Sequence, residues 1–220
     1  MSWIQKYRFE ILIFLAISLV YFLVRLPNLT LQPIFADEAI YIRWAQIMRA
    51  EPTLRFVSVT DGKTPLFMWI LIPFFKIFSD PLLAGRFLSV LSGFFTMLGV
   101  FFLSRRIFGL KVVFWSTLIY AVVPYTVFFD RMALVDSMLA SFSIWALYFS
   151  LWLIKSQRLD LAMVLGYLLG GAWLTKTPAM LNFISLPITI LAFNLKPAKK
   201  SSLFKLLFFW GIAILIALVV

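Results

Sequence analysis

The sequence predicts an all-α protein, a polytopic membrane bundle of about seven transmembrane helices with a long outer loop that contains interfacial helices. Hydrophobic residues make up 63% of the 220 residues and charged residues 13%, whereas soluble domains are roughly 45–50% apolar and about 25% charged. A second observation is the length of the uncharged runs, because a helix needs about 20 apolar residues to cross a bilayer. A third is that lysines and arginines stand between these runs, as topology signals do.

Seven uncharged runs are near the length of a membrane-spanning helix. In chain order they are residues 11–24, 87–104, 112–129, 137–154, 161–175, 177–195 and 206–220. The first run is short, and we expect Glu10 and a snorkelling Arg25 to extend it into the interfaces. A cleavable signal peptide is the alternative for this run. Val24-Arg25-Leu26-Pro27 follows it in place of a small-residue cleavage site, which favours an uncleaved anchor.

The distribution of charge predicts a cytoplasmic N-terminus, because short loops rich in Lys and Arg stay inside. With this orientation the inside loops hold only two of the 9 acidic residues, Glu10 and Asp160. They hold eleven of the 20 basic residues, which are Lys6, Arg8, Arg105, Arg106, Lys111, Lys155, Arg158, Lys196, Lys199, Lys200 and Lys205. A plasma (inner) membrane location is expected.

The outer loop is expected to extend over about residues 26–85. Within it, residues 37–49 place apolar side chains at helical spacing and predict a short helix. Glu51-Pro52 ends this helix, and Asp61-Gly62 indicates a turn. Residues 64–75 are apolar but short, and a crossing there would invert every later loop against the charge rule. We therefore expect an interfacial helix there, and no soluble domain.

Composition also limits the chemistry. The chain has no Cys, so it has no thiolate nucleophile and no disulfide framework. The redox compartment therefore stays undetermined. The chain also has no His, the residue that most often acts as a base near neutral pH. The net charge of +11 does not indicate nucleic-acid binding, because the cations separate apolar runs instead of forming a basic face. Acid–base chemistry must use Asp, Glu, Lys or Tyr.

Ionisable residues gather at the outer ends of the predicted helices, where such groups usually face a cavity, a partner or a ligand. For any single residue, topological flanking or a surface ion pair is the simpler explanation, but the convergence of separate segments favours a site. The residues are Asp37, Glu38, Asp61, Lys63, Arg86, Asp130, Arg131, Asp136 and Lys176.

Asp37 and Glu38 open the predicted helix of the outer loop, where carboxylates also complement the positive helix end. Helix capping is therefore the simpler interpretation of this pair. Adjacent helical residues point about 100° apart, so one carboxylate can face a site while the other braces the backbone or a metal. The spacing does not say which does which. Lys63 begins the interfacial helix, where it can hold a phosphate or contact lipid headgroups.

The order of these motifs resembles the N-terminal part of a GT-C type membrane glycosyltransferase, of the kind typified by protein O-mannosyltransferases and lipid A aminoarabinose transferases. An Asp-Glu pair in a long outer loop is followed by a Lys-x-Pro-Leu-aromatic segment at Lys63 and by Arg86. The next crossing ends Arg105-Arg106-Ile107-Phe108-Gly109, and an Arg-x-x-x-x-Asp at Arg131 and a Thr-Lys-x-Pro at Thr175 follow. The family's Lys-Pro-Pro and Thr-Lys-Gly-Pro are here Lys63-Thr64-Pro65 and Thr175-Lys176-Thr177-Pro178.

The resemblance implies transfer of a sugar from a lipid-linked, polyprenyl-phosphate donor to a glycan, lipid or protein acceptor on the outer face of the bilayer. It implies a catalytic role for Asp37 as general base, with Glu38 as its supporting neighbour. Donor-phosphate binding is implied for Lys63, Arg131 and Lys176, and a place in the cavity for Asp136, Arg86 and Asp61. Family members are longer, and this chain stops inside an apolar run at Val220. Residues 1–220 are therefore expected to be the N-terminal part of one domain, truncated at the C-terminus.

Two other functions stay open. A transporter or flippase also places charges at one mouth of a bundle, but predicts inverted repeats and broken helices in matching halves, which the sequence does not show. A non-catalytic membrane scaffold would tolerate loss of Asp37. The carboxylates are compatible with a divalent cation, yet no spaced ligand set names a metal.

Overall fold

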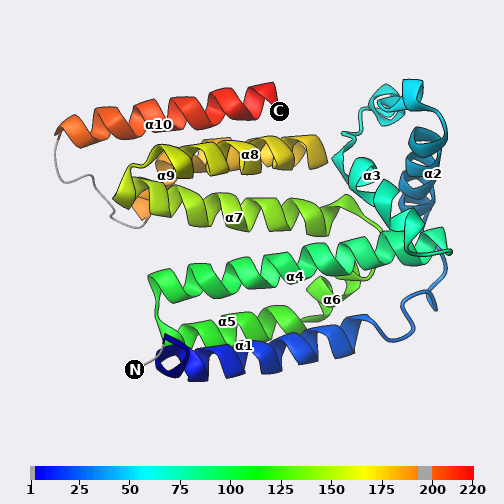
Figure 1. Ribbon diagram of the computed structural model, residues 1–220, viewed down its shortest axis with the longest axis horizontal. Coiled ribbons are helices and arrows are strands. Elements are labelled where there is room, and N and C mark those ends of the chain that lie inside the picture. The colour runs from blue at the N-terminus through cyan, green and yellow to red at the C-terminus, as the bar shows by residue number, and fades with distance from the viewer. Residues whose placement is uncertain (1–2, 193–199) are drawn as a thin grey trace.

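The computed structural model describes residues 3–192 and 200–220, and every regular element in these ranges is a helix, which confirms the all-α prediction (Figure 1). Lys196, Lys199 and residues 193–195 of the predicted sixth crossing lie outside the described residues. The helices are α1 (Trp3–Arg25), α2 (Ala36–Ala50), η1 (Pro52–Leu54), η2 (Val57–Asp61), α3 (Leu66–Leu71), η3 (Ile72–Lys76), α4 (Pro81–Ile107), α5 (Leu110–Val122), α6 (Pro124–Asp130), α7 (Val135–Ser156), α8 (Leu159–Thr175), η4 (Thr177–Ala179), α9 (Met180–Ala192) and α10 (Lys200–Val219).

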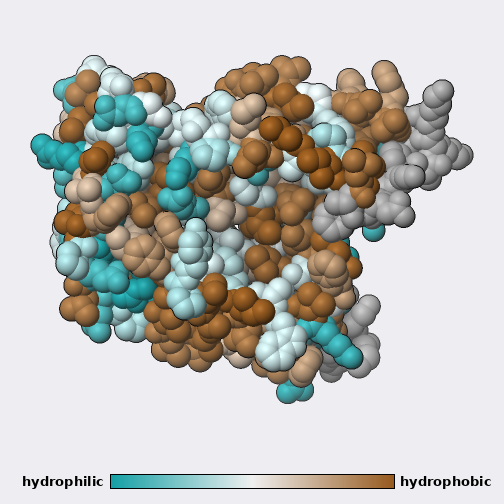
Figure 2. All heavy atoms as spheres, turned by 180° about the vertical axis from the view of Figure 1, so that it is seen from behind, coloured by the Kyte–Doolittle hydropathy of each residue, from teal (hydrophilic) through white to brown (hydrophobic). Residues whose placement is uncertain are grey.

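The long helices form a bundle with the outer loop at one end of it. Figure 1 shows α1, α4, α5, α7, α8 and α10 running side by side, while α2 runs across them beyond their ends. Helix α4 packs against α5 on one side and α7 on the other, and α8 packs between α7 and α10. Hydrophilic residues gather over the end that carries the outer loop, and broad hydrophobic areas cover the bundle (Figure 2). This surface is that of a protein embedded in lipid.

Two described helices, α4 and α7, are long and apolar enough to cross a membrane by themselves. The pair α5 and α6 forms a third candidate span, bent by 58°. We predicted one uninterrupted crossing over residues 112–129, but the chain breaks at Val123, because a residue before proline avoids helical backbone geometry and Val123 is extended. Helices α8 and α10, and the η4–α9 segment, are apolar but shorter. The count of seven crossings stays a prediction.

The outer loop contains the helices expected from its sequence. Helix α2 covers the predicted range 37–49, and Glu51 at its end is extended because Pro52 follows. The apolar segment 64–75 forms α3 and η3, which together are too short to span a bilayer. Gly62 ends η2 in a left-handed conformation, with φ of 69°, so that the chain turns sharply before Lys63.

An apolar core joins the outer loop to the bundle. Tyr41, Ala45 and Met48 lie on one face of α2 at helical spacing and are buried against α3, while the segment 132–135 before α7 completes the cluster. The contact holds α2 in a fixed place relative to α4 and α7. The start of α2, where Asp37 and Glu38 lie, is thereby positioned at the end of the bundle.

Candidate active site

Glu38 is fully buried in an ion pair with Arg86, which is also fully buried. Arg86 Nε donates to Glu38 Oε1 at 2.8 Å, and Arg86 Nη2 donates to Oε2 at 2.8 Å. The backbone N–H groups of Ala133 and Phe35 donate to the same carboxylate at 2.6 and 2.9 Å. The carboxylate therefore joins α2, α4 and the segment before α7, and all of its strong acceptor positions are in use.

These contacts decide the protonation of Glu38. Burial alone would raise the pKa of Glu38, but hydrogen bonds from Arg86 and from the N–H groups of Ala133 and Phe35 outweigh it, so the pKa is lowered from its ordinary value of 4.5. A carboxylate stabilised in this way is a poor proton acceptor. The geometry suits a residue that positions its neighbour, Asp37, rather than one that exchanges a proton.

Asp37 has different surroundings from Glu38. It lies in the first turn of α2 and is only partly buried. One turn later on the same helix, Tyr41 is buried. Burial, followed by the negative charges of Asp37 and Asp136, raises the pKa of Tyr41 to about 12, so its hydroxyl is protonated at neutral pH. Asp136 belongs to α7, about a hundred residues later in the chain than Asp37.

A polar cavity of about 220 Å³ adjoins Tyr41. Its lining brings together Asp61 at the end of η2, Lys63 and Thr64 in the turn after it, and Thr175 and Lys176 at the end of α8. Lys176 Nζ lies 2.7 Å from Asp136 Oδ1, and both side chains are partly exposed. Thr64 Oγ1 is buried and finds no hydrogen-bond partner among the described residues. Two ammonium groups and a spare hydroxyl are suited to an anionic ligand.

Two predicted site residues lie elsewhere. Arg86 is enclosed with Glu38, and its remaining N–H groups donate to the carbonyls of Leu29, Gln32 and Pro33. Arg131 donates to the backbone carbonyls at the end of α1 and just beyond it, at 2.9–3.1 Å, which are those of Val24, Arg25, Pro27 and Asn28. The last carbonyls of a helix lack partners within it, so Arg131 closes the end of α1. The geometry joins Lys63 and Lys176 but leaves Arg131 outside their cavity.

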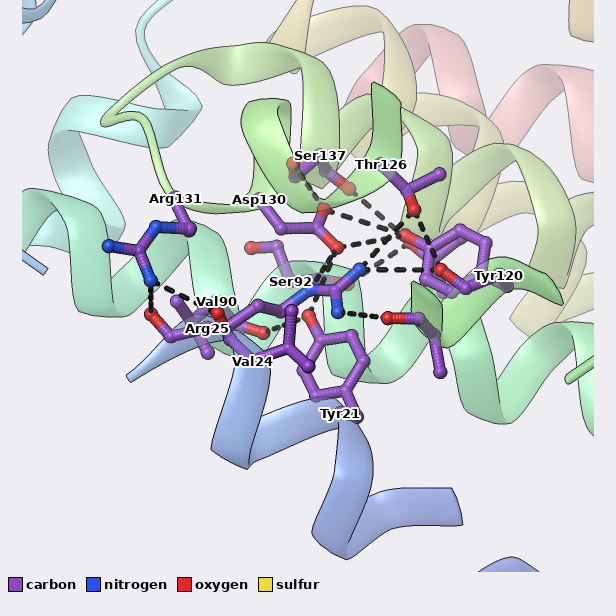
Figure 3. A network of polar contacts seen from close by, with 12 residues as sticks. Tyr21, Val24, Arg25, Val90, Ser92, Tyr120, Thr126, Asp130, Arg131 and Ser137 are labelled. Carbon is purple, nitrogen blue, oxygen red and sulfur yellow. Dashed lines mark hydrogen bonds and ion pairs between the residues drawn. The ribbon is translucent and has the colours of Figure 1, made fainter. Parts of the chain in front are cut away.

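The sequence did not reveal a second buried network, in which α1 meets α6 (Figure 3). Arg25 is fully buried, so the expectation that its side chain snorkels toward the membrane surface is wrong. Its Nε donates to Asp130 Oδ2 at 2.9 Å, and its guanidinium lies 3.8 Å from the centre of the Tyr21 ring. Tyr21 and Ser137 donate hydroxyl hydrogens to the same carboxylate. The signal that could have found this pair is that each member follows an uncharged run, Arg25 after residues 11–24 and Asp130 after residues 112–129.

Metal binding finds no support in the geometry. In the part of the chain that the structure describes, no group of three or more Asp, Glu, His or Cys residues gathers to hold an ion. The carboxylate of Glu38 is engaged by Arg86, and that of Asp136 by Lys176. A divalent cation therefore stays a prediction from composition alone.

The structure is thus a helical bundle with a polar cavity at one end, beside partly buried carboxylates. Residues 62–220 match the model of the dolichyl-phosphate-mannose-protein mannosyltransferase family, and the chain belongs to that family. The match includes Lys63, Arg86, Arg131, Asp136 and Lys176, while Asp37 and Glu38 precede it. No curated protein matches the chain. No solved structure matches it either.

Proposed function

We propose that this protein transfers a sugar from a polyprenyl-phosphate donor to an acceptor hydroxyl on the outer face of the membrane, with Asp37 as general base. The family supports glycosyl transfer from a lipid-linked donor. The single observation that carries the site assignment is the 220 Å³ cavity in which Lys63 and Lys176 meet beside Tyr41, one turn from Asp37 on α2.

The proposed reaction is a single displacement. The acceptor oxygen attacks the anomeric carbon of the sugar while the bond from that carbon to the phosphate oxygen breaks, and the configuration inverts. The acceptor proton passes to Asp37, and the electron pair of the broken bond leaves with the carrier phosphate. Lys63 and Lys176 stabilise the charge that develops there. Lys176 lines the cavity, and its ammonium is held by Asp136 at 2.7 Å.

The direct test is Asp37→Asn, assayed in proteoliposomes with radiolabelled polyprenyl-phosphate mannose and a peptide mixture as acceptor. Loss of a general base lowers the rate by about a hundredfold or more. Because Asp37 is partly exposed, the variant should keep the unfolding temperature of the wild type. Undiminished transfer by the folded variant would refute the base assignment.

Donor binding is tested separately with Lys63→Met. Removing one charged hydrogen-bond donor from the phosphate site should raise the KM for the donor by about tenfold. Lys76→Met is the matched control, because Lys76 is exposed in the same loop and does not line the cavity. Equal donor KM values for the two variants would place the phosphate elsewhere.

A further inference from the structure

A second cavity, of about 440 Å³, lies in the outer loop and shares no lining residue with the first. Helix α2 contributes Met48 and Arg49, the segment after it contributes Pro52, Arg55 and Phe56, and α3 and η3 contribute Trp69 and Ile72. Tyr41 and Met48 are seven residues apart on one helix, so the two cavities lie about 10 Å from each other along α2. They are neighbouring but separate sites.

The aromatic wall of this cavity is held in place. The Trp69 indole Nε1 donates to the backbone carbonyl of Arg55 at 2.8 Å, which fixes the segment after η1 against α3. Phe56 meets the same indole edge to face, with ring centres 5.3 Å apart. The cavity is therefore a built feature of the loop rather than a gap between loosely placed side chains.

Two arginines form the cationic wall of the cavity. Arg49 and Arg55 are both exposed, and neither belongs to an ion pair among the described residues. Arg49 Nη1 makes only a long contact, 3.4 Å, with the Phe75 carbonyl. Two guanidinium groups on one cavity favour a ligand with a phosphate or carboxylate group.

The surroundings of the two arginines indicate what carries that anion. Leu54, Phe56 and Val59 present apolar side chains to the surface in the same short segment, with 43%, 62% and 53% of each exposed. Exposed apolar groups beside cations are typical of surfaces that enter the headgroup region of a bilayer. The outer loop lies at one end of the bundle (Figure 1), and the topology predicted from the charge distribution places that end where the outer leaflet meets water.

We propose that this Arg49–Arg55 cavity binds an anionic phospholipid of the outer leaflet. The two guanidinium groups hold the lipid phosphate, Trp69 and Phe56 line the glycerol region, and Leu54 and Val59 insert among the acyl chains. The site would hold the η1–η2 segment against the membrane. It is independent of sugar transfer, because none of its residues takes part in the proposed reaction.

The test is native mass spectrometry of the full chain, released from nanodiscs that contain equal amounts of phosphatidylglycerol and phosphatidylcholine. The wild type should retain phosphatidylglycerol preferentially. Arg49→Gln/Arg55→Gln should retain about 25-fold less, since each cation near an anionic surface contributes about a fivefold preference. Phe56→Ser should weaken retention without changing the charge.

The matched control is Arg43→Gln/Lys76→Gln, which removes two exposed cations from the same loop but none from the cavity. Equal retention by the two double variants would overturn the proposal, as would inorganic phosphate or an acidic peptide that displaces the lipid at equal concentration. Asp37→Asn should retain the lipid as the wild type does. A failure of lipid binding is thus distinguishable from a failure of the proposed reaction.

Discussion

Asp37 and Glu38 are neighbours in sequence with opposite surroundings, and this contrast gives the first prediction at the scale of residues. Glu38→Gln leaves Arg86 buried without its counter-charge, and breaking a buried ion pair costs about 3 kcal/mol or more. We expect a clear fall in the free energy of unfolding, measured by denaturant titration in detergent. Asp37→Asn should change it by less than about 0.5 kcal/mol. Equal stabilities of the two variants would contradict the structure.

The pKa of Glu38 predicts a dependence of stability on pH. The ordinary pKa is 4.5, and that of the folded protein is lower. The folded state therefore binds the proton less readily than the unfolded state, so the contribution of Glu38 is complete above pH 4.5 and is lost as the pH falls toward the folded pKa. The difference between the unfolding temperatures of the wild type and Glu38→Gln should narrow as the pH falls below 4.5. A constant difference would refute the shift.

The sequence indicates that the acidic pair matters but not how its members divide their roles. Helical geometry separates the two side chains by about 100°, and only the tertiary partner decides which one is buried. That partner, Arg86, lies 48 residues away. Lys63 and Lys176 line one cavity, and their predicted binding of the donor phosphate stays a prediction. The sequence does not distinguish Arg131 from these two lysines as a phosphate ligand, because a guanidinium group binds the carbonyls at a helix end as readily as it binds phosphate.

At the scale of elements, Gly93 allows α4 to approach the start of the α6–α7 connection. A Cβ at Gly93 would lie 2.2 Å from Asp130 Cγ, a carboxylate that is itself buried against Arg25. Gly93→Ala should therefore push the two segments apart and lower the free energy of unfolding by about 3 kcal/mol.

Gly211→Ala is the control for this substitution. Gly211 lies in α10 with no atom within 4 Å of its added Cβ, so alanine should be neutral or stabilise the helix by up to about 1 kcal/mol. Thermal unfolding in detergent checks both variants. If Gly93→Ala unfolds at the wild-type temperature, α4 and Asp130 are not in contact.

Elements were more predictable than their ends. Apolar periodicity located α2, and Pro52 set its end. The bend at Val123 was missed because the run 112–129 contains no charge, and hydropathy does not register a local backbone constraint such as Pro124. The burial of Arg25 was missed for a related reason. A cation at the end of an apolar run has the same sequence pattern whether it reaches the interface or a carboxylate on another helix.

At the scale of the whole molecule, the charge distribution predicts which side each loop occupies. The chain has no Cys, so single introduced cysteines report their own positions. Thr60→Cys, in the outer loop, should react with a membrane-impermeant maleimide in intact cells. Ser156→Cys, at the end of α7, should react only after permeabilisation. Both positions are exposed. The reverse pattern would overturn the topology and the proposed outer-face reaction with it.

Glu38 pairs with Arg86 of α4. The depth in the bilayer of the neighbouring Asp37, the proposed base, therefore depends on the tilt of α4. Arg86 lies near the start of α4, whose 27 residues extend about 40 Å, against a hydrocarbon thickness of roughly 30 Å. Such a helix fits the bilayer by tilting away from the bilayer normal, and its tilt decreases as the bilayer becomes thicker. Asp37 is next to Glu38 and must move with α4. The depth of Asp37 in the bilayer should therefore follow the acyl-chain length of the surrounding lipid.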